Sequence, residues 1–99
     1  MTEVTIYSRR ECHLCDVVLR IAHQIQVEHP FTITQVKIDD DPLLLEQYGT
    51  RVPVIVINGQ EMFAGKVTEG DFRQAIQKTS RQGLFNRLLS RLGFSRVIR

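Results

Sequence analysis

The chain has 99 residues, enough for one hydrophobic core but not for two. Its 42% hydrophobic and 24% charged content is typical of a soluble globular protein. No apolar run is long enough to span a membrane, and residues 1–4 have neither the basic nor the apolar region of a secretory signal. We therefore expect a cytoplasmic protein whose thiols are mostly reduced.

The formal net charge of +2 is unevenly distributed. Residues 1–80 hold eight Lys or Arg and all eleven Asp or Glu, a balance of −3, whereas residues 81–99 hold five Arg and no acid, a balance of +5. This asymmetry predicts one domain over residues 1–80 and a basic extension over residues 81–99. The acidic domain gives no reason to expect nucleic-acid binding.

The extension carries apolar residues on one helical face and polar residues opposite. The pattern predicts a short amphipathic helix that packs on the domain, forms a weak dimer, meets a partner or lies on an anionic membrane surface. The apolar face consists of Leu84, Phe85, Leu88, Leu89 and Leu92.

The sequence of the first half of the domain predicts two strands and two helices in alternation. Residues 3–7 alternate apolar with polar and indicate a strand. Apolar residues at helical spacing from Leu14 indicate a helix that ends before Pro30, and the β-branched stretch 31–38 indicates a second strand. Asp41 is the expected N-cap of a short helix that ends at Gly49.

The second half adds a hairpin and a helix. Residues 53–57 form an apolar run, typical of a strand covered on both faces, and Asn58-Gly59 predicts a tight turn into residues 60–64. Thr68 with Asp71 resembles a capping box that opens a further helix. The strand–helix–strand start implies parallel pairing and the hairpin an antiparallel edge, so the pattern predicts an α/β domain with a four-stranded mixed sheet flanked by helices.

Both cysteines, Cys12 and Cys15, fall where the first strand gives way to the first helix. At about 100° per residue, Cys15 lies at the edge of the apolar stripe and Cys12 points away from it, so we expect Cys12 to be accessible and Cys15 shielded. Free amides at a helix N-terminus stabilise a thiolate, and outer thiols of such motifs have pKa values of about 3.5 to 7.5. The pKa of Cys12 is therefore expected to be lowered.

Charged neighbours would adjust this effect. Arg9 and Arg10 add positive charge, which Glu11 and Asp16 oppose. A protonated His13 would favour the Cys12 thiolate and make the disulfide more oxidising, and the alternative is an exposed histidine without a role.

The stretches "TIYSRRECHLC", "GTRVPVIVINGQEMFAG" and "EGDFRQAI" together resemble the glutaredoxin-like proteins of the thioredoxin-fold superfamily, over about residues 3–78. The resemblance implies a thioredoxin-like fold, with the amphipathic helix of the extension added to it. It also implies a cis bond between Val52 and Pro53 beside the sulfurs, with the Val52 backbone pairing with an extended substrate.

The chain departs from the glutaredoxin pattern at three places. Arg51 stands where glutaredoxins usually have threonine, and Ala64-Gly65-Lys66 stands where they have a Gly-Gly pair followed by an acidic helix start. The residues between the two cysteines are His-Leu, where glutaredoxins usually have Pro-Tyr. The substrate is therefore either a glutathione mixed disulfide or an acidic protein bound with help from Arg51. The expected substrate-binding residues are Arg10, His13, Arg51, Val52, Pro53, Gly65 and Lys66.

The predicted function is that of a dithiol thiol–disulfide oxidoreductase in cell redox homeostasis. Cys12 attacks a protein disulfide or a glutathionylated thiol, and Cys15 resolves the mixed disulfide. Glutathione or a dedicated reductase restores the dithiol, and we expect no metal and no organic cofactor, with glutathione as a candidate co-substrate. The protein is expected to be a monomer or a weak dimer.

Three other interpretations remain open at this point. Zinc normally takes four ligands, whereas His23 and His29 lie too far along the helix to join the two cysteines. A metal or iron–sulfur site shared by two chains would avoid that difficulty. A redox-silent domain used only for binding is the third.

Overall fold

The structure is a computed structural model that describes residues 2–79. In chain order it contains β1 (Glu3–Ser8), α1 (His13–Glu28), β2 (Thr32–Lys37), α2 (Pro42–Tyr48), β3 (Val54–Ile57), β4 (Gln60–Ala64) and a further helix over 69–79. The predicted order of elements is confirmed. The amphipathic helix predicted for residues 81–99 lies outside the described residues. None of the helices described is long and apolar enough to cross a membrane.

The strands form a four-stranded sheet in the order β2-β1-β3-β4. β1 is parallel to β2, and the pairs β1–β3 and β3–β4 are antiparallel, as predicted for a mixed sheet. Because β1 and β3 run in opposite directions, Tyr7 near the end of β1 pairs with Val54 at the start of β3. The loop after β1 and the loop before β3 therefore leave the same end of the sheet.

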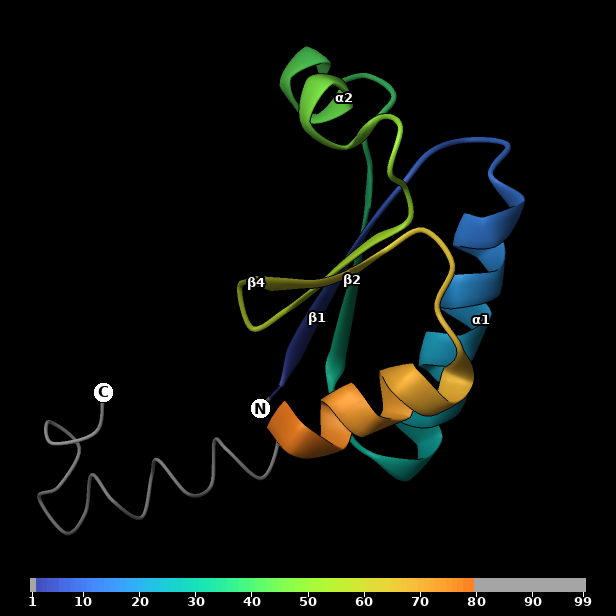
Figure 1. Ribbon diagram of the computed structural model, residues 1–99, viewed down its shortest axis with the longest axis vertical. Helices are drawn as coiled ribbons and strands as arrows, with labels where there is room; N and C mark the ends of the chain where they lie inside the picture. The colour runs from blue at the N-terminus through green and yellow to red at the C-terminus, as the bar shows by residue number, and fades with distance from the viewer. Residues whose placement is uncertain (1, 80–99) are drawn as a thin grey trace, which may run out of the picture.

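One face of the sheet is covered by α1 and the helix 69–79, which lie together on one side in Figure 1. The apolar stripe of α1 buries Val18, Ala22 and Ile25, and the helix 69–79 buries Phe72 and Ile76. This is the larger core, and it fixes α1 against the two central strands. Its strand residues are Val4, Ile6, Ile55 and Ile57.

The opposite face carries a smaller core under α2, near the end of β1. Tyr48 of α2 stacks on Tyr7 with ring centroids 4.4 Å apart. Asp41 caps α2 by accepting hydrogen bonds from the amides of Leu43 and Leu44. Since β3 contacts both cores, its apolar run is explained.

The hairpin turn at Asn58-Gly59 has the expected backbone conformation, whereas the end of α2 at Gly49 does not have a left-handed glycine. Asn58 and Gly59 both have positive φ, 49° and 83°, as a tight hairpin between β3 and β4 requires. α2 ends before Gly49 as expected, yet Gly49 keeps a right-handed φ of −51°. Its carbonyl instead accepts a hydrogen bond from Arg9 Nη1 at 3.1 Å, so a cation satisfies the helix end without a left-handed residue.

The position of α1 on the sheet should depend on Ile25, which has no exposed surface. Replacing Ile25 with Ala is expected to lower the free energy of unfolding by about 2–5 kcal/mol, because a buried side chain is lost and a cavity remains. Val27→Ala is the control on the same helix, since Val27 is 87% exposed, and it should change stability by less than about 0.5 kcal/mol. Urea unfolding followed by circular dichroism measures both, and equal losses would contradict this packing.

Candidate active site

The two cysteines lie at the end of the sheet where β1 finishes and β3 begins. Cys12 immediately precedes α1, and Cys15 is in the first turn of that helix. Val52 and Pro53 precede β3 at this same end, and Gly65 follows the end of β4, which pairs with the start of β3. The topology therefore gathers three loops from distant parts of the sequence.

Cys12 is the N-cap residue of α1. Its sulfur accepts a hydrogen bond from the Cys15 backbone N–H at 3.1 Å, and its carbonyl accepts one from the Asp16 N–H at 3.2 Å. The sulfur thus occupies the place of a capping oxygen, at the positive end of the helix. A thiolate at Cys12 is therefore more stable than a thiolate in open solvent.

Cys15 is the shielded partner. It is only 1% exposed, whereas Cys12 is half-buried, which confirms the expected difference in access. The two residues form a disulfide with their Cα atoms 5.2 Å apart, within the usual range for such bonds. A bulky reagent or substrate can therefore approach the pair only from the side of Cys12.

The loop between β1 and α1 is held by two aspartates that sequence reasoning did not select. Asp39 accepts hydrogen bonds from the Arg10 backbone N–H at 3.1 and 3.3 Å, and Asp40 forms an ion pair with Arg10 Nη2 at 3.1 Å. Glu11, which precedes Cys12, adopts a left-handed φ of 53°. The signal available in the sequence was a run of three aspartates of which the cap of α2 needs only one.

A cis peptide bond joins Val52 and Pro53, as the resemblance implied. Gly65 donates its N–H to the Pro53 carbonyl at 2.8 Å, which ties the loop after β4 to the start of β3. The backbone N–H and C=O of the half-buried Val52 take part in no hydrogen bond within residues 2–79. Val52 therefore has backbone groups available to an extended chain.

Arg51 is engaged by its own protein. Its Nη1 lies 2.6 Å from Glu61 Oε2, its Nη2 donates to the Gln47 carbonyl at 3.2 Å, and its guanidinium lies 5.5 Å from the centre of the Tyr48 ring. Burial raises the pKa of Tyr48, and nearby Tyr7 and Glu61 add to that effect while Arg51 opposes it. Tyr48 is thus a neutral phenol that serves as a packing surface.

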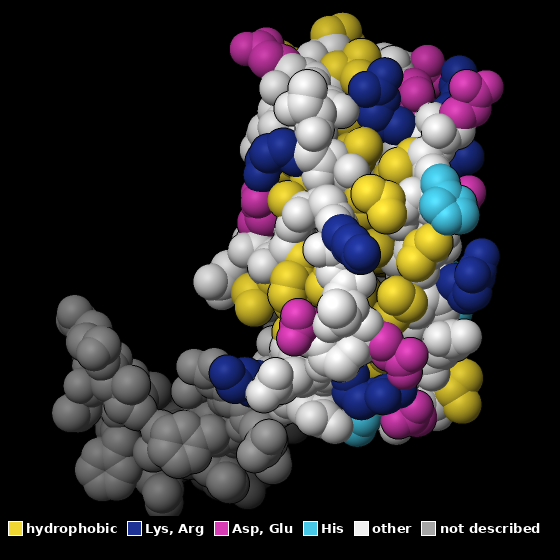
Figure 2. All heavy atoms as spheres, turned by 45° about the vertical axis from the view of Figure 1, so that its right-hand side comes forward, with side chains coloured by type: hydrophobic (Ala, Val, Ile, Leu, Met, Phe, Trp, Pro, Cys, Tyr) yellow, Lys and Arg dark blue, Asp and Glu magenta, His cyan; other side chains and the backbone are white. Residues whose placement is uncertain are grey.

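The remaining predicted residues are exposed. His13 is the first residue of α1, and Lys66 follows Gly65, both with their side chains in solvent. In the described part of the chain, no group of three or more His, Cys, Asp and Glu side chains is arranged to hold a metal ion. Lys and Arg alternate with Asp and Glu over the face shown in Figure 2, with hydrophobic side chains between them.

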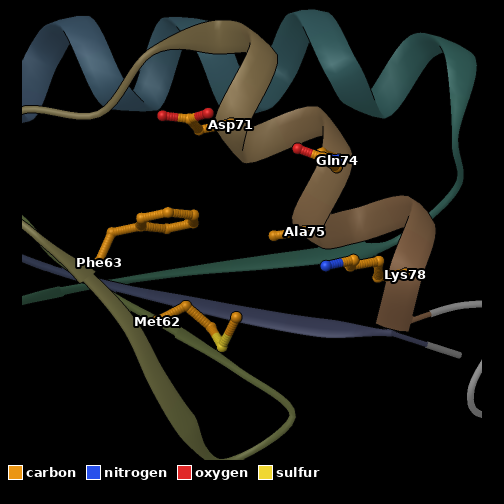
Figure 3. A pocket seen from close by; sticks show the side chains of 6 residues that line it. All are labelled: Met62, Phe63, Asp71, Gln74, Ala75 and Lys78. Atoms are coloured by element: carbon orange, nitrogen blue, oxygen red, sulfur yellow. The ribbon is translucent and has the colours of Figure 1, made fainter.

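A pocket of about 200 Å³ lies away from these residues, between β4 and the helix 69–79. Figure 3 shows Met62 and Phe63 of β4 facing side chains of that helix. None of the predicted site residues lines it. The lining residues are Met62, Phe63, Asp71, Gln74, Ala75 and Lys78.

Residues 3–77 match the family model of the glutaredoxin-like domain (DUF836). The chain belongs to this family. A solved structure of protein XcR50 from X. campestris is 32% identical, covers 76% of this chain and 96% of its own, and has a TM-score of 0.67. Family membership and the Cys12–Cys15 disulfide support a role in thiol redox chemistry.

More distant structures share the fold. Protein Ne2328 from Nitrosomonas europaea is 24% identical, with coverage of 70% of this chain and 84% of its own and a TM-score of 0.62. A thioredoxin from Halobacterium salinarum is 17% identical, with coverage of 78% and 73% and a TM-score of 0.61. The thioredoxin-like fold predicted from the sequence is therefore confirmed. No relative is found among curated proteins.

The amide–sulfur contact predicts a lowered pKa for Cys12 in the reduced protein. In a Cys15→Ser variant, which keeps the backbone N–H, Cys12 should titrate below the value of about 8.5 for an ordinary thiol. Cys15→Pro removes that N–H in the first helical turn, where proline is tolerated, and should raise the pKa by about one unit. Iodoacetamide alkylation as a function of pH measures both values, with circular dichroism as the check on folding. Equal values for the two variants would show that this amide does not stabilise the thiolate.

Proposed function

We propose that the protein is a dithiol thiol–disulfide oxidoreductase with Cys12 as nucleophile and Cys15 as resolving thiol. The observation that carries the proposal is the placement of Cys12 as the accessible N-cap of α1, with the buried Cys15 within bonding distance. A helix N-terminus favours the thiolate, which is the attacking species in disulfide exchange.

The exchange proceeds in two balanced steps. The Cys12 thiolate attacks one sulfur of a substrate disulfide, so that a Cys12–substrate disulfide forms and the other substrate sulfur leaves as a thiolate. Deprotonated Cys15 then attacks Cys12, which forms the Cys12–Cys15 disulfide and releases the second substrate thiolate. Two electrons pass from the cysteine pair to the substrate, and the released thiolates take up protons.

The open backbone of Val52 supports an extended binding mode for the substrate. A chain that pairs with the Val52 N–H and C=O would gain main-chain hydrogen bonds at the end of the sheet where Cys12 lies. Such pairing recognises backbone and therefore accepts many sequences. We propose protein disulfides and glutathione mixed disulfides as the substrate class. In a glutathione mixed disulfide, the peptide-like part of glutathione would pair with the Val52 backbone.

A reducing partner must return the pair to the dithiol form. Two glutathione molecules, which become glutathione disulfide, or one protein dithiol would supply the two electrons. We propose the cytoplasm as the compartment, because its reduced thiol pool would keep Cys12 and Cys15 ready for attack.

The test is to trap the covalent intermediate. Cys15→Ser should accumulate a Cys12 mixed disulfide when it is mixed with glutathione disulfide or with a disulfide-bonded peptide, because the resolving sulfur is missing. Mass spectrometry of the intact variant measures the adduct, and Cys12→Ser is the matched control that should form none. The wild-type protein should instead show reversible loss of two hydrogens in a redox titration against glutathione.

The nature of the adduct identifies the substrate class. A glutathione adduct would support glutaredoxin-like activity, and an adduct with the peptide alone would support thioredoxin-like activity. If Cys15→Ser forms no adduct and the wild-type dithiol does not oxidise reversibly, the proposal is wrong, and a redox-silent binding role would replace it. A coloured species or a bound metal shared by two chains would instead identify a bridging site.

A further inference from the structure

We propose that Arg51 is a positioning residue, which holds the Val52 backbone ready for substrate pairing and does not itself contact the substrate as a charge. This inference rests on the proposed function, because it concerns the same substrate edge. It differs from the role expected from the sequence, in which Arg51 attracts an acidic substrate.

The Arg51 side chain is committed to three partners within the domain. Arg51 Nη1 forms an ion pair with Glu61 of β4 at 2.6 Å, and Nη2 donates a hydrogen bond to the Gln47 carbonyl near the end of α2 at 3.2 Å. The guanidinium also lies 5.5 Å from the centre of the Tyr48 ring. Side-chain exposure in the ion pair is 40% for Arg51 and 41% for Glu61, so both groups are partly shielded. The carboxylate neutralises the cation that an acidic substrate would otherwise meet.

The Arg51 backbone is fixed as well. Its N–H donates to the Tyr48 carbonyl at 2.8 Å, which continues the hydrogen-bonded turn at the end of α2. The next residue, Val52, packs its side chain against the smaller core, while its own N–H and C=O make no hydrogen bond in the described part of the chain. On the far side, the Pro53 carbonyl is bonded to Gly65. The free backbone of Val52 is therefore held between two anchored neighbours.

The anchoring on the Arg51 side depends on elements that are remote in sequence. Glu61 belongs to β4, Tyr48 to α2, and Val52 to the loop between α2 and β3. The Arg51 guanidinium contacts Glu61 and Tyr48, and the Arg51 backbone is bonded directly to Val52. A lysine could make these contacts only in part, because it lacks the planar fork of the guanidinium. Loss of these contacts would leave Val52 attached but less ordered, and an extended substrate would then have to order it on binding.

The first test compares steady-state reduction of three disulfide-bonded peptides that differ only in flanking acidic, neutral or basic residues. Arg51→Gln and Glu61→Gln should each raise KM about three- to tenfold for all three peptides, with kcat little changed. Arg51→Lys should recover part of the loss, and Arg51→Gln combined with Glu61→Gln should be no worse than either alone. Arg73→Gln is the matched control, since Arg73 pairs with Glu28 and Glu69 at 2.8 Å but lies on the helix 69–79.

The charge series separates the two roles of Arg51. A rise in KM for the acidic peptide alone, or a rise for Arg51→Gln that Glu61→Gln does not reproduce, would show direct recognition of substrate charge and overturn the inference. Unchanged KM values in both variants would overturn it as well.

A second test does not depend on catalysis. Backbone ¹⁵N relaxation of the oxidised protein should give Val52 an order parameter near the rigid value of about 0.85, and this should fall toward about 0.6 in Arg51→Gln and Glu61→Gln but not in Arg73→Gln. If Val52 stays equally ordered in all variants, the positioning role is wrong whether or not the protein reduces disulfides. If the wild-type protein reduces no peptide while Val52 loosens as expected, the proposed function is wrong, and only the ordering of Val52 by Arg51 is supported.

Discussion

The contact between the Cys15 amide and the Cys12 sulfur is the interaction on which the site depends. One hydrogen bond begins the helix and also places a sulfur at the positive end of the backbone dipoles. The larger core maintains this contact, because the buried residues of α1 fix where the helix starts. If α1 began one turn later, the same two cysteines would lie in an irregular loop and neither would have this environment.

The direction of the strands brings the other parts of the site to the cysteines. Since β1 and β3 are antiparallel, residues separated by some forty positions leave the sheet at a common end. β4 then returns to that end and contributes Gly65. Rigid strands thus position loops whose own sequences have little regular structure, and the charged side chains around them mainly connect one loop to another.

Much of this arrangement could be predicted from local patterns. Helical spacing placed Cys12 outside and Cys15 inside, and Asp41, Thr68 and the Asn58-Gly59 turn marked element ends because each acts within a few residues. The partners of Arg10 and Arg51 could not be found in this way. Both ion pairs join residues that strand pairing brings together, so local spacing in the sequence does not predict them.

The irregularity in the pairing of β3 with β4 allows one short strand to serve two opposite sides of the sheet. Phe63 stands opposite Ile55 and Glu61 opposite Val56, with Met62 unpaired between them. In a regular strand, side chains two positions apart point the same way. The extra residue lets an aromatic ring enter the larger core while a carboxylate reaches the guanidinium on the reverse side. Without Met62, β4 could not keep both the packing of Phe63 in the larger core and the ion pair of Glu61 with Arg51.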